Sequence, residues 1–344
     1  MKNTILVTGG TGFIGSWVVK GLLEKGNTVR LTVRDKSKKE KYSFLQEIAD
    51  KSEGTLELWE ADLMKKGSFD APAKGSDMIA HIASPFFLKI KDAQKDLVDP
   101  AVKGTENVLE AANKSGTVKK VVLTSSVASV HGDNIDMKNQ NISIFTEEHF
   151  NTTSSLSHQP YSFSKVSAEN KAWEINKKQN EWELVVMNPS FVMGPSLTTT
   201  SKSESLKVMT ELLTGKYKSG APDLKFGFVD VRDVAKAHIL GLETEAKGRH
   251  ILAERVAGIL EMANVVKSTY EDTYKVPTSY VPRWLLMIVG PIAGFSRKFV
   301  RNNIGHDLKL DSSKSKEKLG LKYIPFEKTI TDMVEQMKLQ GIVK

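Results

Sequence analysis

A glycine-rich turn near the N-terminus constrains the fold of this chain more than any other feature. The stretch "VTGGTGFIGSWVV" (7–19) follows a short apolar run and opens a helical pattern. A strand, a glycine turn and a helix in this order are typical of a dinucleotide-binding βαβ unit. The spacing fits two versions of that fingerprint, Gly10-Gly12-Gly15 and Gly9-Gly12-Gly15, and the sequence leaves both open.

The rest of the first half alternates short Val/Ile-rich runs with helical patterns. This alternation predicts an α/β fold, a Rossmann-type doubly wound parallel sheet, with a smaller and mostly helical C-terminal substrate lobe. The predicted strands are 4–8, 28–34, 56–62, 78–84, 119–126 and 183–189, with helices at 14–26, 102–116 and 162–179. We expect residues 1–189, joined again by about 226–252, to form the cofactor-binding domain, and about 190–225 and 253–344 to form the substrate-binding lobe. The polar segment 132–160 is long enough to predict a functional or mobile loop.

Composition narrows the protein class. The 344 residues are 40% apolar and 26% charged, as in ordinary globular proteins. The absence of cysteine excludes a disulfide framework, a thiolate metal site and a cysteine nucleophile, and it fits a cytoplasmic protein. The most apolar stretch, "WLLMIVGPIAGF" (284–295), is too short for a membrane span, and we interpret it as a buried helix and turn, with an interfacial segment as the alternative. The net charge of +8 is spread out, so neither a nucleic-acid nor a membrane partner is expected.

The one dense basic run, "RDKSKKEK" (34–41), follows the second predicted strand. An acidic side chain at the end of that strand suits the ribose 2′-hydroxyl of NAD, and an arginine suits the 2′-phosphate of NADP. Arg34 and Lys41 would supply a planar fork and a point charge for a phosphate. Asp35 could serve NAD instead if the strand runs one residue longer. We favour NADPH, with NADH as the alternative.

Several motifs together resemble the extended branch of the short-chain dehydrogenase/reductase superfamily. Within it, they resemble the dihydroflavonol-reductase-like group, which includes cinnamoyl-CoA reductases and NADPH-dependent aldehyde, ketone and methylglyoxal reductases. The motifs are "TGGTGFIGSW", "TVRLTVRD", "LELWEADL", "GSFD", "HIASP", "VLTSS", "YSFSK", "NPSFVMGP", "FVDVRDVAKAH" and "SSKSKEKLGLKYIPFEKTITDM", which span nearly the whole chain.

The resemblance implies a catalytic set of Ser126, Tyr161 and Lys165. Reducing a carbonyl requires a hydride on carbon and a proton on oxygen, and an ordinary tyrosine, with a pKa of about 10, is a poor acid at neutral pH. A lysine one helical turn away stabilises the phenolate, and a serine hydroxyl can donate to the developing alkoxide. The expected cofactor contacts are Gly9, Thr11, Gly12, Phe13, Ile14, Gly15, Arg34, Lys41, Asp62, Leu63, Ile82, Ala83, Ser84, Thr124, Tyr161, Lys165, Pro189 and Val192.

The chain departs from the family pattern in two places. Many superfamily members carry an asparagine where this chain has Pro100 and Ala101, so a proton relay through an asparagine side chain is not expected. The cysteine-containing signature of cinnamoyl-CoA reductases is absent around Tyr161, which counts against a CoA-thioester substrate.

The substrate pocket is predicted to be apolar, and its partner is a small carbonyl compound. The candidates are Phe86, Phe87, Val127, His131, Phe163, Met193, Leu197, Phe226 and Trp284; each could equally be a core residue, and His131 could be a plain loop histidine. The expected function is an NADPH-dependent carbonyl reductase that is a monomer or a homodimer. The alternatives are an extended-branch NAD-dependent nucleotide-sugar epimerase or dehydratase and a non-catalytic cofactor-sensing protein, and intact Tyr161 and Lys165 count against the latter.

Overall fold

A seven-stranded parallel sheet organises the protein. The computed structural model describes residues 2–84, 90–198, 203–292 and 294–343. The strand order is β3 (Thr55–Glu60), β2 (Thr28–Val33), β1 (Thr4–Thr8), β4 (Met78–His81), β5 (Lys120–Thr124), β6 (Glu183–Pro189) and β9 (Gly248–Leu252), and every pair is parallel. The chain first moves outward through β2 and β3 and then returns to the other side of β1. The predicted doubly wound sheet is confirmed, with its switch point between β1 and β4.

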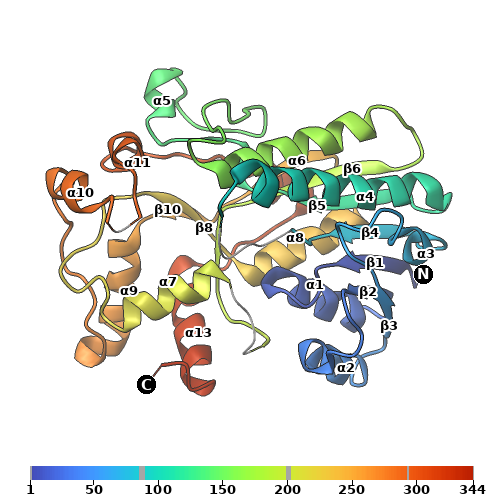
Figure 1. Cartoon of the computed structure of the whole chain (residues 1–344). Coiled ribbons are helices and arrows are strands. Elements are labelled where there is room, and N and C mark those ends of the chain that lie inside the picture. Colours follow the sequence, from blue (N-terminus) through green and yellow to red (C-terminus); the bar gives the residue numbers. More distant parts are fainter. Residues whose placement is uncertain (1, 85–89, 199–202, 293, 344) are drawn as a thin grey trace.

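Helices cover both faces of this sheet (Figure 1). One face carries α4 (Asp99–Ser115) and α6 (Pro160–Asn176), which pack against each other, and the other carries α1 (Phe13–Glu24) and α8 (Val231–Glu243). Smaller elements complete this part of the chain: α2 (Ser43–Ala49), α3 (Asp70–Ala73), α12 (Ser313–Leu319), the π-helical turn η2 (Gln94–Val98) and the 3₁₀ turns η1 (Lys39–Lys41) and η3 (Val127–Ser129).

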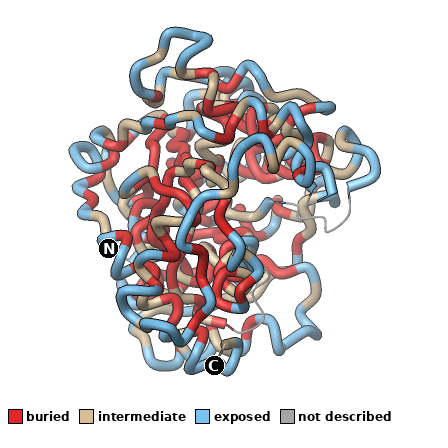
Figure 2. The backbone as a smooth tube through the Cα atoms, turned by 90° about the vertical axis from the view of Figure 1, so that its left-hand side faces the viewer, coloured by how far each residue is buried: buried red, intermediate tan, exposed pale blue. Residues whose placement is uncertain are grey.

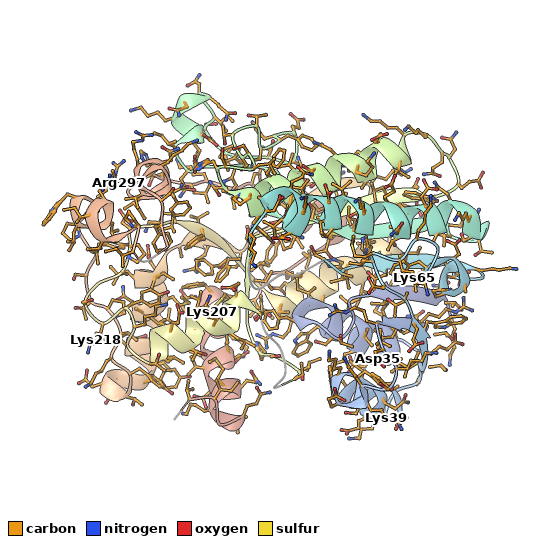
Figure 3. The ribbon with its side chains drawn as sticks, in the orientation of Figure 1. Asp35, Lys39, Lys65, Lys207, Lys218 and Arg297 are labelled. Atoms are coloured by element: carbon orange, nitrogen blue, oxygen red, sulfur yellow. The ribbon has the colours of Figure 1, made fainter. Side chains whose placement is uncertain are left out.

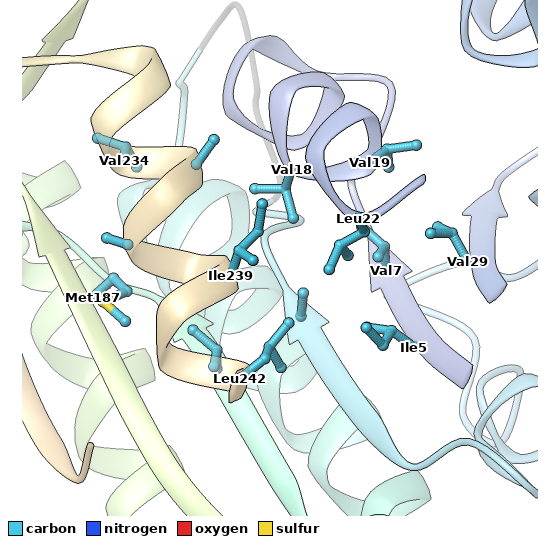
Figure 4. Close-up of a cluster of buried hydrophobic side chains, with 14 of the residues drawn as sticks. Ile5, Val7, Val18, Val19, Leu22, Val29, Met187, Val234, Ile239 and Leu242 are labelled. Atoms are coloured by element: carbon cyan, nitrogen blue, oxygen red, sulfur yellow. The ribbon is translucent and has the colours of Figure 1, made fainter. Parts of the chain in front are cut away.

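The main core lies between the sheet and the α1–α8 layer (Figure 4). Val18 and Leu22 of α1 and Val234 of α8 are fully buried there, together with Val7 of β1. Truncating a side chain such as Leu22 to alanine would cost about 2–5 kcal/mol of folding free energy. This packing holds the first strand, the glycine turn and α1 rigidly against the rest of the sheet.

The C-terminal part contains a second, three-stranded sheet that the sequence did not predict. Its order is β10 (Arg255–Ala257), β8 (Phe226–Asp230) and β7 (Phe191–Met193). Its core is closed by α7 (Glu204–Leu213), α9 (Ile259–Tyr270) and α13 (Phe326–Leu339), with the 3₁₀ turn η4 (Glu271–Thr273) after α9. Of the segment 226–252, β8 therefore belongs to the small sheet, whereas α8 and β9 belong to the large one. The division into two functional domains stays a prediction.

The helices α10 (Arg283–Val289) and α11 (Arg297–Asn303) form the outer end of this lobe (Figure 1). The prediction that 284–295 is buried is wrong for the outer side of α10, because Trp284 is 66% exposed and Ile288 is 61% exposed. Leu286 and Met287 face inward instead, against a small core formed with Val300 of α11. No helix among the described residues is long and apolar enough to cross a membrane.

The segment 132–160 is packed rather than loose. It contains one short helix, α5 (Asp136–Asn139), and its Phe145 is 2% exposed. The backbone of Phe145 bonds to that of Lys309, which ties the segment to the C-terminal part. Figure 2 shows how burial is distributed over the whole molecule, with buried stretches through the middle and exposed ones at the periphery.

Candidate active site

The glycine turn lies at the switch point of the sheet, where open α/β folds bind their ligands. Gly9 has φ of 71°, and a Cβ atom there would approach the backbone of Ala83 after β4 to 2.7 Å. A Cβ on Gly15 would lie 2.1 Å from the carbonyl oxygen of Gly9. Gly12 is exposed, and a Cβ atom there would meet only that same carbonyl oxygen, at 3.2 Å. A Cβ on Gly10 would instead strike Leu31 of the core, so the 9-12-15 spacing describes the turn and Gly10 is a packing residue.

The first turn of α1 presents unsatisfied backbone donors. Gly12 caps the helix without a side-chain hydrogen bond, and the first turn contains no acidic residue. The N–H groups at such an end carry a partial positive charge and bind phosphates well. Thr11, Phe13 and Ile14 lie around this end and are partly exposed. The cradle therefore fits the pyrophosphate of a dinucleotide.

Arg34 directly follows β2 and Lys41 ends the turn η1 that comes after it, and both are exposed. Within the described residues, neither side chain has a hydrogen bond or an ion pair. One oxygen of the Asp35 carboxylate is already engaged, since Oδ1 accepts hydrogen bonds from the backbone N–H and the hydroxyl of Ser37, at 2.9 and 2.6 Å. These bonds hold the pKa of Asp35 below its ordinary value. Figure 3 labels Asp35 and Lys39 in this loop, beside α2. Two exposed cations beside a carboxylate with one oxygen already in use suit a 2′-phosphate better than a 2′-hydroxyl.

Half of the other predicted cofactor residues gather around a cavity between the ends of β4 and β5 and the helices α4 and α6. This cavity of about 20 Å³ has Leu63, Ala83, Ser84, Thr124 and Lys165 in its wall. Ala101 of α4 also lines it, so the place expected for an asparagine holds a methyl group.

The remaining predicted cofactor residues lie around the edges of this region. Asp62 uses its Oδ1 to accept from the N–H of Met64 at 2.8 Å, within a turn. Ile82 packs on the main core, as does Val192 of β7, and Pro189 ends β6.

Tyr161 and Lys165 lie in the first two turns of α6, which begins at Pro160. Lys165 is 8% exposed, and its Nζ donates to the hydroxyl of Ser84 at 3.1 Å and lies 5.7 Å from the centre of the Tyr161 ring. Tyr161 is 53% exposed, which leaves its phenol accessible to a substrate. His81 lies close by and bonds Thr8 at 2.8 Å; burial first, and then the Lys165 charge, lowers the pKa of His81 to about 3. The imidazole therefore stays neutral, and the cation of this site is Lys165.

Ser126 directly follows Ser125 at the end of β5 and caps the turn η3. Its Oγ accepts from the N–H of Ala128 at 3.1 Å, which leaves the hydroxyl proton available for another acceptor. Its carbonyl accepts from Asn188 at 3.2 Å. Because η3 packs against α6, Ser126 is held on the same side of the sheet as Tyr161.

A buried carboxylate behind this serine was not found from the sequence. Glu169, one turn beyond Lys165 on α6, is 1% exposed. It accepts hydrogen bonds from Ser125 and Ser129 at 2.5 Å and from Asn188 at 2.9 Å, and it pairs with Arg249 of β9 at 2.6 Å. The four-residue spacing from Lys165 was the only local signal for it. The network braces the segment that carries Ser126.

The predicted substrate residues do not form one pocket in the described structure. Met193 is fully buried in the core of the small sheet, and its assignment to the pocket stays a prediction. Trp284 lies exposed on α10. His131 stacks on Phe145 with ring centres 5.2 Å apart, and burial lowers the pKa of His131 to about 4, as expected of a packed loop histidine.

The other substrate candidates remain untested. Val127 packs against the Phe145 core, and Phe226 packs against Phe191 and Phe228. Phe163 and Leu197 are partly exposed. Phe86 and Phe87 lie outside the described residues. Among the described residues, no group of three or more His, Cys, Asp or Glu side chains could hold a metal ion.

The sheet, the glycine cradle and the tyrosine–lysine pair define a dinucleotide-binding oxidoreductase with a Rossmann fold. The chain belongs to the NAD dependent epimerase/dehydratase family, whose family model matches residues 5–253. This confirms the extended short-chain dehydrogenase/reductase resemblance.

The chain is 36% identical over 350 residues to "Cinnamoyl-CoA reductase CAD2" of Medicago truncatula, covering 98% of this chain and 96% of that relative. Among solved structures, Gre2 of Candida albicans in complex with NADPH superposes with a TM-score of 0.80 at 30% identity, covering 98% and 99% of the two chains. Yeast methylglyoxal/isovaleraldehyde reductase Gre2, also complexed with NADPH, gives 0.78 at 27% identity and covers 99% and 100%.

Proposed function

We propose that this protein is an NADPH-dependent carbonyl reductase that reduces an aldehyde or ketone to an alcohol, with Tyr161 as the general acid. The observation that carries the proposal is the position of Lys165. Its buried ammonium group lies between Ser84, beside the glycine cradle, and the ring of an accessible tyrosine. The relatives support a reductase, because the Medicago truncatula relative and yeast Gre2 are both named as reductases and both Gre2 structures hold NADPH.

In this proposal the nicotinamide, when bound, supplies the hydride to the carbonyl carbon. Tyr161 donates its phenolic proton to the carbonyl oxygen as negative charge develops there. Lys165 stabilises the phenolate that remains, and Ser126 donates a hydrogen bond to the same oxygen. The cradle from Gly9 to Gly15 holds the pyrophosphate, and Arg34 with Lys41 holds the 2′-phosphate. The substrate partner is a small carbonyl compound.

The test is NADPH oxidation by the purified protein against a panel of aldehydes, ketones and 2-oxoaldehydes. We expect saturable turnover of at least one apolar member and little turnover with CoA thioesters. Tightly retained NAD together with turnover of a nucleotide sugar would instead establish an epimerase or dehydratase. The exposed side chains of Arg34 and Lys41 argue against that alternative, because two cations suit a 2′-phosphate and a ribose 2′-hydroxyl offers them no charge.

A further inference from the structure

Asp133 is a buried carboxylate outside the Ser126–Tyr161–Lys165 set, and it joins two distant parts of the chain. It is 2% exposed and lies in the segment between the serine strand and the tyrosine helix. Each of its two oxygens accepts two hydrogen bonds from side chains. Oδ2 accepts from His158 Nε2 and Asn302 Nδ2, both at 2.7 Å, and Oδ1 accepts from Gln159 Nε2 at 2.5 Å and Asn303 Nδ2 at 2.7 Å. The acceptor capacity of the carboxylate is therefore filled.

The four donors come from two places in the chain, the residues just before α6 and the end of α11. His158 and Gln159 directly precede Pro160, the first residue of α6, and Tyr161 is the second. Asn302 and Asn303 end α11 in the C-terminal lobe. One carboxylate therefore ties the outer lobe to the start of the helix that carries the proposed acid.

Backbone bonds next to Asp133 strengthen the link to α11. The N–H of Asn134 donates to Asn303 Oδ1 at 3.0 Å, and the N–H of Ile135 donates to the carbonyl of Asn302 at 3.0 Å. These bonds fasten the segment to the end of α11. A shift of the lobe would be passed on to the carboxylate rather than absorbed by a flexible loop.

Gln159 carries the link into α6. Its φ is 53°, in the left-handed region that non-glycine residues rarely adopt and hold only when their surroundings enforce it. Its side-chain amide donates to Asp133, and its Oε1 accepts from Ser162 at 3.3 Å. Ser162 is the neighbour of Tyr161 in the first turn of α6.

We propose that Asp133 is a positioning residue for Tyr161: through Gln159 it sets the first turn of α6 against the C-terminal lobe, and so fixes where the phenol meets a substrate held by that lobe. The inference rests on the proposed function, since it needs Tyr161 to be the proton donor. It goes beyond the Ser126–Tyr161–Lys165 set, because Asp133 acts through Gln159 rather than on the reacting atoms.

The principal test is Asp133→Asn, which keeps the size of the side chain but replaces one acceptor oxygen by a donor. We expect kcat to fall roughly 10- to 100-fold, the cost of a misplaced catalytic group. The solvent deuterium isotope effect on kcat should rise, because proton transfer becomes slower. Amide hydrogen exchange should increase at residues 160–165 and stay unchanged at 9–15, a readout that does not depend on turnover.

Two further variants separate positioning from general loss of stability. Asp233→Asn removes another carboxylate that is 3% exposed and accepts from the N–H of Ile324 at 2.7 Å, on the opposite side of the sheet from α6. It should lower the melting temperature and leave the isotope effect and the exchange of 160–165 as in wild type. Gln159→Gly removes the side-chain hydrogen bond to Asp133, and glycine adopts a positive φ without strain. The variant should therefore fold well and still reproduce the changes in kcat and isotope effect of Asp133→Asn.

The inference is overturned if Asp133→Asn and Gln159→Gly both keep kcat within about twofold, well short of the expected loss. It is also overturned if kcat falls with no change in isotope effect or in exchange at 160–165, since that pattern means fewer folded molecules. Wild-type protein that turns over no carbonyl contradicts the proposed function itself. In that case, raised amide exchange at 160–165 in Asp133→Asn would still show that Asp133 holds the start of α6. Only its role in positioning a catalytic Tyr161 would be refuted.

Discussion

Tyr161 combines high exposure with a fixed helical position, so its hydroxyl can be removed with little loss of packing. In Tyr161→Phe the ring remains, and we expect an unchanged melting temperature and NADPH Kd. Catalysis should fall roughly 100-fold or more, because the proton donor is lost as charge develops on oxygen. The measurements are kcat, NADPH Kd and thermal melting. A variant that melts normally and retains more than about a tenth of wild-type kcat would refute the role of the phenol.

The cofactor preference depends on a second residue, Arg34. NADPH should be preferred over NADH, and Arg34→Ala should lower the NADPH/NADH ratio of kcat/KM by roughly tenfold or more, the loss expected for a charge-assisted hydrogen bond. Lys39→Ala is the control, because it removes a positive charge from the same exposed loop without removing the planar fork. An unchanged ratio in Arg34→Ala, or a wild type that prefers NADH, would show that the 2′-phosphate is not bound there.

At the scale of elements, α6 is braced along one side. Lys165 faces the cofactor region, and Glu169 one turn later faces β5 and β9, where it pairs with Arg249. The guanidinium also donates to the carbonyls of Glu147 and His149, at 2.8 and 2.5 Å, so it holds the 132–160 segment as well. Burial disfavours the charged form of Arg249 and lowers its pKa, whereas the nearby Glu169 carboxylate stabilises that charge.

Breaking this buried ion pair should therefore be costly. Glu169→Gln removes the carboxylate that pairs directly with the buried Arg249, and we expect the free energy of unfolding to fall by about 3–5 kcal/mol. Glu174→Gln is the matched control on the same helix, since Glu174 pairs with Lys171 and Lys178 at the surface, and its loss should be much smaller. Urea unfolding of the three proteins checks the prediction. Equal losses in the two variants would contradict it.

At the scale of the whole molecule, buried histidines should make stability depend on pH. Burial lowers the pKa of His81 to about 3 and the pKa values of His131, His238 and His250 to about 4, from an ordinary 6.5. The unfolded chain therefore binds up to four more protons between pH 6.5 and 4. Asp233 acts oppositely, because burial raises its pKa to about 6 and the folded protein holds its proton.

With four protons from the histidines and one fewer from Asp233, the unfolded state binds 4 − 1 = 3 more protons than the folded state. Stability should therefore be fully present above about pH 6.5 and be lost as the pH falls towards 4, with a slope of at most on the order of 4 kcal/mol per pH unit near pH 5. The urea midpoint measured at several pH values between 7.5 and 5 tests this. A midpoint that is constant over that range would contradict the prediction.

Much of the site could be predicted because its signals are local. Gly9, Gly12 and Gly15 lie within one turn and one helix start, and Tyr161 and Lys165 lie one helical turn apart, so backbone sterics and the helical period place them without any distant partner. The alternation of apolar runs and helical patterns likewise determined the parallel sheet. The same local signals could not separate pocket from core for Met193, because an apolar residue suits both.

Only the tertiary structure decided which distant groups meet. The bonds from Lys165 to Ser84, from Glu169 to Arg249 and from Asp133 to Asn303 join positions 80 or more residues apart, and no periodicity in the chain encodes such pairs. The small sheet was missed for a related reason: its three-to-five-residue strands carry too short a pattern to recognise, and they are stable only when long-range pairing and the helices of the lobe bury them. The sequence by itself therefore determined the sheet, the glycine cradle and the tyrosine–lysine pair. Only the folded structure decided which buried polar groups pair with each other. An unpaired polar group in the interior is costly, and its partner can come from any part of the chain.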